Sequence, residues 1–224
     1  MNIGFLGSGH ITSSIIEGIF KSKLKIKKIY ISPRNKLISK KLSKRFKKVI
    51  VSNNNQQVID SSSWVFLAVT PHVGNKILKN LKFNKSKKII SLISTMNINR
   101  LKKITKNKNI SRVIPLPFIG MRKGPIIICP NDNKLKNFFK HLGKVIELTS
   151  ENKSKSFWAT SSFMASFYNL LKKFFTCLSG GQIGMGPFLI EIGGSGIALT
   201  ILTFLPINFF NLAKLIVEIK LTTF

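Results

Sequence analysis

Short apolar runs alternate with stretches of helically spaced apolar residues through the first 150 residues. A short continuous run between turn residues indicates a buried strand, and apolar residues three or four apart indicate a helix packed on one face. The clearest strand is Trp-Val-Phe-Leu-Ala-Val at 64–69, which has no polar face. The predicted strands are 2–6, 28–32, 49–51, 64–69, 89–93, 112–114, 124–129 and 145–147.

Helices are predicted between most of these strands, and the alternation favours a parallel sheet with crossover helices. The strand at 112–114 runs into Pro115 and Pro117 and is expected at an edge of the sheet. Ligands of such sheets bind at the carboxyl ends of the strands. The predicted helices are 11–20, 36–45, 55–60, 73–81, 98–104 and 135–142.

Two domains are expected from this pattern. Residues 1–150 form a Rossmann-like, doubly wound α/β domain, and residues 151–224 form a short helical region that begins with a long helix to about residue 175. The second region also differs in charge, because residues 174–224 hold two lysines and two glutamates while the whole chain has a net charge of +30. The basic excess therefore lies entirely in residues 1–173.

The basic excess admits a nucleic-acid or membrane-surface protein as an alternative function. The 44% apolar composition excludes a disordered chain. Most of the 37 cations are lysines scattered through every segment, and no nucleic-acid-binding motif is present, so this alternative is less favoured. A biased coding composition accounts for the same pattern.

Two cysteines, Cys129 and Cys177, lie too far apart for a disulfide framework or a metal motif. We therefore expect a reducing, cytoplasmic location and no metal, and the start of the chain predicts no signal peptide. Residues 192–213 are uncharged and long enough to cross a membrane, but glycines, a proline and asparagines interrupt them. An altered dimerisation segment is favoured there, with a membrane anchor as the alternative.

Candidate chemistry begins at Gly7-Ser8-Gly9-His10-Ile11, between the first strand and the first helix. In the dinucleotide fingerprint the first glycine allows a tight turn, and the second lets a pyrophosphate approach the backbone amides that open the helix. Thr12 takes the place of the usual third small residue. The segment predicts a nucleotide site.

The end of the second predicted strand lacks the acid that would hold the ribose hydroxyls of NAD. No acid occurs between Glu17 and Asp60, and Ser32-Pro33-Arg34 stands at the expected place. A hydroxyl and a guanidinium suit a ribose 2′-phosphate. NADP is the expected cofactor, with NAD as the alternative.

With these residues in view, the chain resembles the pyrroline-5-carboxylate reductase family, which reduces a cyclic imine to proline with a nicotinamide cofactor. The resemblance rests on the opening at 1–11, the segment at 31–34, Val-Phe-Leu-Ala-Val-Thr-Pro at 65–71, and Arg-Val-Ile-Pro at 112–115 followed by Gly124. It implies an NADPH-dependent imine reductase of proline biosynthesis that forms homo-oligomers.

The resemblance also assigns residues. Thr160 and Ser161 are implied as substrate contacts, and Asn54 is added to the cofactor site. The implied cofactor residues are Gly7, Ser8, Gly9, His10, Ile11, Ser32, Arg34, Asn54, Ala68, Val69, Thr70 and Pro71.

The chain departs from the family pattern at one residue of the cofactor segment and at the substrate motifs. Thr70 replaces a lysine, Leu116 replaces an asparagine, and of the family's Ser-Gly-Ser-Gly-Pro-Ala-Tyr only Ser161 matches. The family's Ser-Pro-Gly-Gly segment has no counterpart. These departures leave an inactive or diverged nucleotide-binding relative as an alternative, and a shifted reading frame would explain the composition change near residue 174.

Overall fold

The structure is a computed structural model that describes residues 1–154, 157, 159, 163, 166–167 and 170, all within one compact unit, residues 1–170. The candidate substrate residues Thr160 and Ser161 and the uncharged stretch 192–213 lie outside the described residues. The expected domain boundary near residue 150 stays a prediction. No helix in the described part of the chain is long and apolar enough to cross a membrane.

An eight-stranded sheet with the order β3-β2-β1-β4-β5-β6-β7-β8 organises the described domain. All neighbouring strands run parallel except β6 and β7. The strand order reverses between β1 and β4, where open α/β sheets bind their ligands. The strands are β1 (Asn2–Leu6), β2 (Lys28–Ile31), β3 (Val49–Val51), β4 (Trp64–Leu67), β5 (Lys88–Ser91), β6 (Ile110–Pro115), β7 (Pro125–Cys129) and β8 (Lys144–Glu147).

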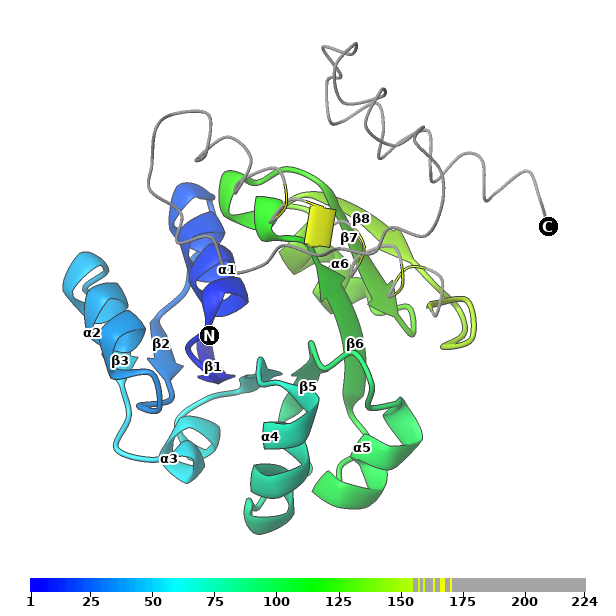
Figure 1. Cartoon of the computed structure of the whole chain (residues 1–224), viewed down its shortest axis with the longest axis horizontal. Helices are drawn as coiled ribbons and strands as arrows, with labels where there is room; N and C mark the ends of the chain where they lie inside the picture. The colour runs from blue at the N-terminus through cyan, green and yellow to red at the C-terminus, as the bar shows by residue number, and fades with distance from the viewer. Residues whose placement is uncertain (155–156, 158, 160–162, 164–165, 168–169, 171–224) are drawn as a thin grey trace, which may run out of the picture. The chain divides into compact units, whose positions relative to one another are not determined.

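Helices cover both faces of the sheet, which confirms the predicted doubly wound α/β class (Figure 1). Ile15 and Ile16 of the first helix pack on one face against Phe5 and Phe66, and Leu78 and Leu101 pack on the other against Leu67. The α-helices are α1 (His10–Lys21), α2 (Lys36–Arg45), α3 (Asn55–Asp60), α4 (Pro71–Ile77), α5 (Ile98–Thr105) and α6 (Asn133–Phe139). The 3-10 helices are η1 (Leu78–Asn80) and η2 (Pro117–Met121).

The prediction that residues 112–114 form an edge strand is wrong. β6 lies between β5 and β7, and all six of its residues are buried. Pro115 is tolerated because it is the last residue of the strand, where few ladder bonds remain to be made. The short η2 then reverses the chain without a crossover, so β7 runs antiparallel to β6.

The strand predicted at 64–69 ends two residues early in the structure. β4 stops at Leu67, although the Ala68 N–H still donates to the Leu6 carbonyl at 2.8 Å. Residues 68–70 therefore form the turn that leads into α4. This early end brings the segment to the edge of the sheet beside the glycine turn after β1.

Candidate nucleotide-binding site

The segments predicted to hold a cofactor meet at the carboxyl edge of β2, β1 and β4. The Gly7 N–H donates to Ser32 Oγ at 2.9 Å, which joins the turn after β1 to the residue after β2. The Ala68 amide bonds β1 on the other side. The turn after β1 is thus held between the two neighbouring segments that the sequence singled out.

Gly7 is required at its position by both conformation and space. Its φ of +108° lies in a region that side-chain-bearing residues rarely adopt. A Cβ there would stand 2.2 Å from the Ala68 carbonyl oxygen, far closer than any normal contact. The first fingerprint glycine therefore lets β1 turn against the end of β4.

Gly9 has the opposite surroundings. It precedes α1 in an extended conformation, and a Cβ built on it would meet nothing within 4 Å. Neither packing nor backbone strain in this domain requires a glycine here. The open space lies directly at the amino end of a 12-residue helix whose first turn holds no acid, which suits an approaching anion.

Two hydroxyl side chains complete the turn. Thr12 Oγ1 donates to the Gly7 carbonyl at 2.7 Å, so the residue at the third fingerprint position ties the turn to α1. Ser8 is 3% exposed, and its Oγ has no hydrogen-bond partner among the described residues. A buried hydroxyl without a partner is costly, and a bound ligand would supply one.

Of the predicted residues after β2 and β3, one is buried and supports the glycine turn, and two are exposed. Ser32 is buried and accepts from Gly7, so it braces the turn, and its role as a phosphate contact stays a prediction. Asn54 is exposed and caps α3 by accepting from the Gln57 N–H at 2.9 Å. Arg34 is exposed at the same edge of the sheet, available to a 2′-phosphate.

The remaining predicted residues stand at the start of α1 and in the turn after β4. His10 is exposed as the first residue of α1, and Ile11 follows it. Thr70 is exposed and Pro71 is the first residue of α4. The structure thus places the predicted cofactor residues at successive carboxyl strand ends, on the side of the sheet where open α/β folds bind nucleotides.

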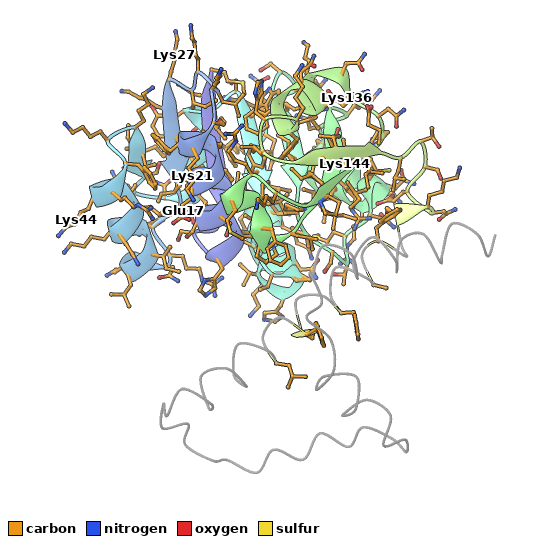
Figure 2. All side chains as sticks on the ribbon, turned by 90° about the horizontal axis from the view of Figure 1, so that it is seen from above. Glu17, Lys21, Lys27, Lys44, Lys136 and Lys144 are labelled. Atoms are coloured by element: carbon orange, nitrogen blue, oxygen red, sulfur yellow. The ribbon has the colours of Figure 1, made fainter. Side chains whose placement is uncertain are left out.

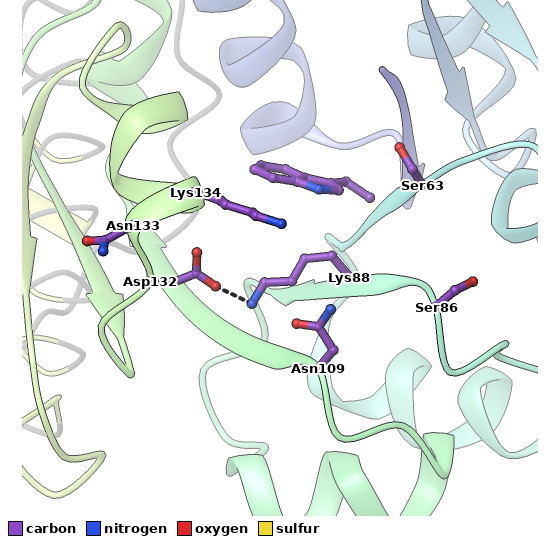
Figure 3. A pocket seen from close by; sticks show the side chains of 8 residues that line it. Ser63, Ser86, Lys88, Asn109, Asp132, Asn133 and Lys134 are labelled. Carbon is purple, nitrogen blue, oxygen red and sulfur yellow. Dashed lines mark hydrogen bonds and ion pairs between the residues drawn. The ribbon is translucent and has the colours of Figure 1, made fainter.

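A separate pocket lies at the opposite edge of the sheet and contains none of the predicted residues. It has a volume of about 440 Å³ and is lined where β4, β5 and β6 begin. Lys88 of β5 forms an ion pair there with Asp132, and Lys134 lies above them (Figure 3). Lys88 also donates to Ser111 Oγ at 2.9 Å, so its charge is held by neighbouring groups.

Asp132 has a structural role in that pocket as the residue that caps α6, accepting from the Leu135 N–H at 3.0 Å. Burial raises the pKa of its carboxyl, but the hydrogen bonds from Lys88 and the Leu135 amide and the Lys88 charge outweigh burial and leave the pKa below its ordinary value. The carboxylate is therefore ionised at neutral pH, and its arrangement resembles a stabilising ion pair more than a reactive group.

A buried charged cluster was missed by the sequence analysis. Arg112, in the middle of β6, is 5% exposed and forms an ion pair with Glu151. Cys129 stands opposite Arg112 on β7; burial and the Glu151 charge raise the pKa of its thiol, and the Arg112 charge offsets only part of this. A lone arginine inside an apolar strand was the available signal, since a buried guanidinium requires partners.

The many other cations are dispersed over the surface. Lys44 on α2 and Lys136 on α6 project from different sides of the domain, and Lys27 just before β2 and Lys144 at the start of β8 lie at other places again (Figure 2). Glu17 pairs with Arg45, and Glu147 pairs with Lys136. The described part of the chain holds no group of three His, Cys, Asp or Glu side chains arranged for a metal ion.

Comparisons with known proteins agree with this geometry. Residues 2–98 match the family described as NADP oxidoreductase, coenzyme F420-dependent. Pyrroline-5-carboxylate reductase 3 of Danio rerio is 28% identical over 138 residues, which cover 58% of this chain and 46% of that protein. The Xenopus laevis counterpart is 26% identical over 134 residues, covering 56% and 46%. The matched part thus spans about half the length of these relatives.

Solved structures share the fold. Plasmodium falciparum pyrroline carboxylate reductase with NADP bound has a TM-score of 0.64 at 20% identity, over 82% of this chain and 71% of that one. The Coxiella burnetii pyrroline-5-carboxylate reductase gives 0.62 at 20% identity, over 99% and 92%. Both share the α/β fold of the described domain. The N-terminal domain of this chain is similar in sequence to pyrroline-5-carboxylate reductases and shares the fold of their solved structures.

Proposed function

We propose that this protein is an NADPH-dependent oxidoreductase that reduces a cyclic imine of the pyrroline-5-carboxylate type. The observation that carries the proposal is the turn at Gly7–Ile11 before α1. Gly7 has a positive φ there, and the space where a Cβ of Gly9 would stand is empty. The curated relatives and the Plasmodium falciparum structure with NADP bound support the same activity.

The residues of the turn fit a dinucleotide. The backbone amides after Gly9 would hold the pyrophosphate, and the buried Ser8 hydroxyl would gain the hydrogen-bond partner that it lacks within the described residues. Arg34 would bind the 2′-phosphate, and no carboxylate stands between Glu17 and Asp60 to hold a free ribose hydroxyl. NADP is therefore preferred to NAD.

The other half of the cofactor is assigned to the turn after β4. When bound there, a nicotinamide supplies the hydride for reduction. The turn at 68–70 and the first residue of α4 would orient that ring beside the substrate carbon. Thr160 and Ser161 are the proposed substrate contacts, on the strength of the family resemblance alone. Assembly into a homo-oligomer and a cytoplasmic location belong to the same proposal.

A second candidate is a relative that binds the nucleotide without turning over an imine. It is favoured by Leu116, which is 8% exposed and apolar where the family carries an asparagine. A leucine offers no hydrogen bond to a substrate or to a neighbouring group that holds it. This candidate predicts the same cofactor affinity and no reduction of cyclic imines.

The test is a turnover assay with the full chain. Oxidation of NADPH is followed by its absorbance with and without pyrroline-5-carboxylate, and proline is quantified in the same samples. The proposal expects saturable, imine-dependent NADPH consumption with an equal amount of proline formed. NADPH binding without proline formation would move the assignment to the second candidate, and failure to bind either nicotinamide nucleotide would overturn both.

A further inference from the structure

The buried arginine of β6 has a specific set of partners at the carboxyl side of β5. Arg112 Nη2 donates to the carbonyl oxygens of Ile93 at 3.3 Å and Ser94 at 2.6 Å, and Nη1 donates to the Glu151 carboxylate. A guanidinium this deeply buried is stabilised only when such acceptors surround it. Two of its acceptors are backbone groups of the segment that follows β5.

Glu151 bonds the other end of the same segment. Its Oε1 and Oε2 accept from the Ile98 N–H at 3.1 and 3.2 Å. Ile98 is the first residue of α5, so one of the helix's unpaired amides is satisfied by this carboxylate. Arg112 and Glu151 therefore hold residues 93–98 at both ends.

This segment packs against the turn after β4. A Cβ on Gly74 of α4 would lie 3.0 Å from Ile93 Cδ1, 3.5 Å from Met96 Sδ and 3.6 Å from Val69 Cγ2. The buried side chains of Ile93 and Met96 thus surround Gly74 together with the side chain of Val69, a predicted cofactor residue that packs against the same apolar cluster. Between them Ser94 and Thr95 are exposed.

The strand order indicates which half of a dinucleotide this segment would meet. Each half of such a sheet binds one mononucleotide, and the adenosine ribose lies at the end of β2. The ends of β4 and β5 lie on the other side of the switch point between β1 and β4. They would therefore border the nicotinamide half.

We infer that Arg112 and Glu151 are positioning residues, which fix residues 93–98 so that the exposed Ser94 and Thr95 border the nicotinamide half of the cofactor. The pair acts through the segment and not by touching the cofactor. The inference rests on the proposed nucleotide binding and adds a function for a cluster remote from the glycine turn. Loss of the Arg112–Glu151 pair should make residues 93–98 more mobile and weaken NADPH binding. Binding of the adenosine half alone should not change.

The test compares Glu151→Gln with Glu147→Gln in the full chain. Both substitutions remove a glutamate charge from an ion pair, but Glu147 pairs with Lys136 on α6, away from residues 93–98. Two ligands are titrated into each variant: NADPH, and adenosine 2′,5′-bisphosphate, which carries the adenosine half alone. Hydrogen exchange of the peptide covering residues 93–98 is measured without ligand.

For Glu151→Gln we expect exchange of the peptide to accelerate about tenfold and the NADPH Kd to rise about tenfold, the size expected for lost charged hydrogen bonds. The Kd of the bisphosphate should change by less than about twofold, and Glu147→Gln should resemble the wild type throughout. Unchanged exchange in Glu151→Gln, or equal weakening of both ligands, would overturn the positioning role.

The wild type separates this inference from the proposed function. If the wild type binds neither ligand, the proposed function fails. If the wild type binds both ligands and Glu151→Gln shows the same exchange and the same NADPH Kd as the wild type, only the positioning role fails. Should Glu151→Gln fail to fold, Asn97→Ala replaces it, because Asn97 is exposed and caps α5 by accepting from the Arg100 N–H at 2.8 Å. That variant should raise the NADPH Kd by about threefold with the bisphosphate unchanged, and an unchanged NADPH Kd would overturn the inference.

Discussion

The two edges of the sheet differ in how their polar groups are satisfied. At the amino edge, where the pocket lies, Lys88 bonds Asp132 and Ser111, and Asp132 caps α6. At the carboxyl edge, Gly9 opens on empty space and the buried Ser8 hydroxyl has no partner among the described residues. The amino edge holds a pocket of about 440 Å³, yet the Lys88 and Asp132 charges that line it are already paired with one another.

Unsatisfied polar groups, more than concavity, mark the candidate site. Polar side chains that pair with one another stabilise the fold and leave little to attract a ligand. Backbone amides at a helix start and a buried hydroxyl without a partner gain most from an anion that arrives. We therefore expect nucleotide binding at the carboxyl edge, whereas the paired groups at the amino edge stabilise the fold.

Substitution of the first glycine of the turn should have the largest effect on stability. Gly7→Ala places a Cβ 2.2 Å from the Ala68 carbonyl and forces alanine to a positive φ, so we expect a loss of about 3 kcal/mol or more in the free energy of unfolding. The melting temperature should fall by about 10 °C. Calorimetry or circular dichroism during heating measures the change.

Gly9→Ala is the matched control and the functional probe. Nothing lies within 4 Å of its Cβ, so the melting temperature should stay within about 2 °C of the wild type. The NADPH Kd should nevertheless rise at least about tenfold, because the methyl group occupies the approach to the amides of α1. Wild-type NADPH affinity in a folded Gly9→Ala variant would contradict the site.

Arg34→Ala sharpens the cofactor assignment at the same edge. Removing an exposed guanidinium should leave the free energy of unfolding nearly unchanged. The NADPH Kd should rise about ten- to hundredfold, the range expected for loss of a charged hydrogen bond. The NADH Kd should stay the same, since NADH has no 2′-phosphate. Equal losses for both nucleotides in fluorescence titrations would remove the 2′-phosphate assignment.

Asp132→Asn tests the other edge and has the smallest expected effect. Asparagine keeps a capping oxygen and removes the charge, so the free energy of unfolding at pH 7 should fall by about 1 kcal/mol. NADPH binding should not change. Urea denaturation measures the first quantity, and a weakened NADPH affinity would show that the two edges are not independent.

The pH dependence of this effect has a definite sign. Because the pKa of Asp132 in the folded protein lies below its ordinary value, its ion pair contributes stability above that value and loses it as pH falls through the folded pKa. The difference between wild type and Asp132→Asn should therefore be constant near neutral pH and shrink below about pH 4. A difference that grows on acidification would contradict the ion-pair assignment.

Local patterns in the sequence were sufficient for most of the sheet and for the glycine turn. The limits of α2, β3 and α3 were predicted as the structure has them, because a turn-forming residue adjoins each element, namely Asn35, Ser52 and Asn54. The predicted turn residues Gly7 and Ala68 proved to be neighbours, as adjacent parallel strand ends require.

Features that depend on distant pairing could not be predicted. The interior place of β6 and its antiparallel neighbour depend on the path of η2, and the wrong edge assignment came from giving Pro115 too much weight. The bonds of Arg112 to Ile93, Ser94 and Glu151 join residues far apart in the chain. Spacing along a sequence carries no record of such contacts.

The most direct test of the NADP site is the titration of the wild-type chain with NADPH and NADH, followed by tryptophan fluorescence and by nucleotide fluorescence. The account predicts saturable binding of both, with NADPH bound more tightly, in competition with adenosine 2′,5′-bisphosphate. Absence of saturable binding, or a preference for NADH, would contradict the assignment of the carboxyl edge as an NADP site.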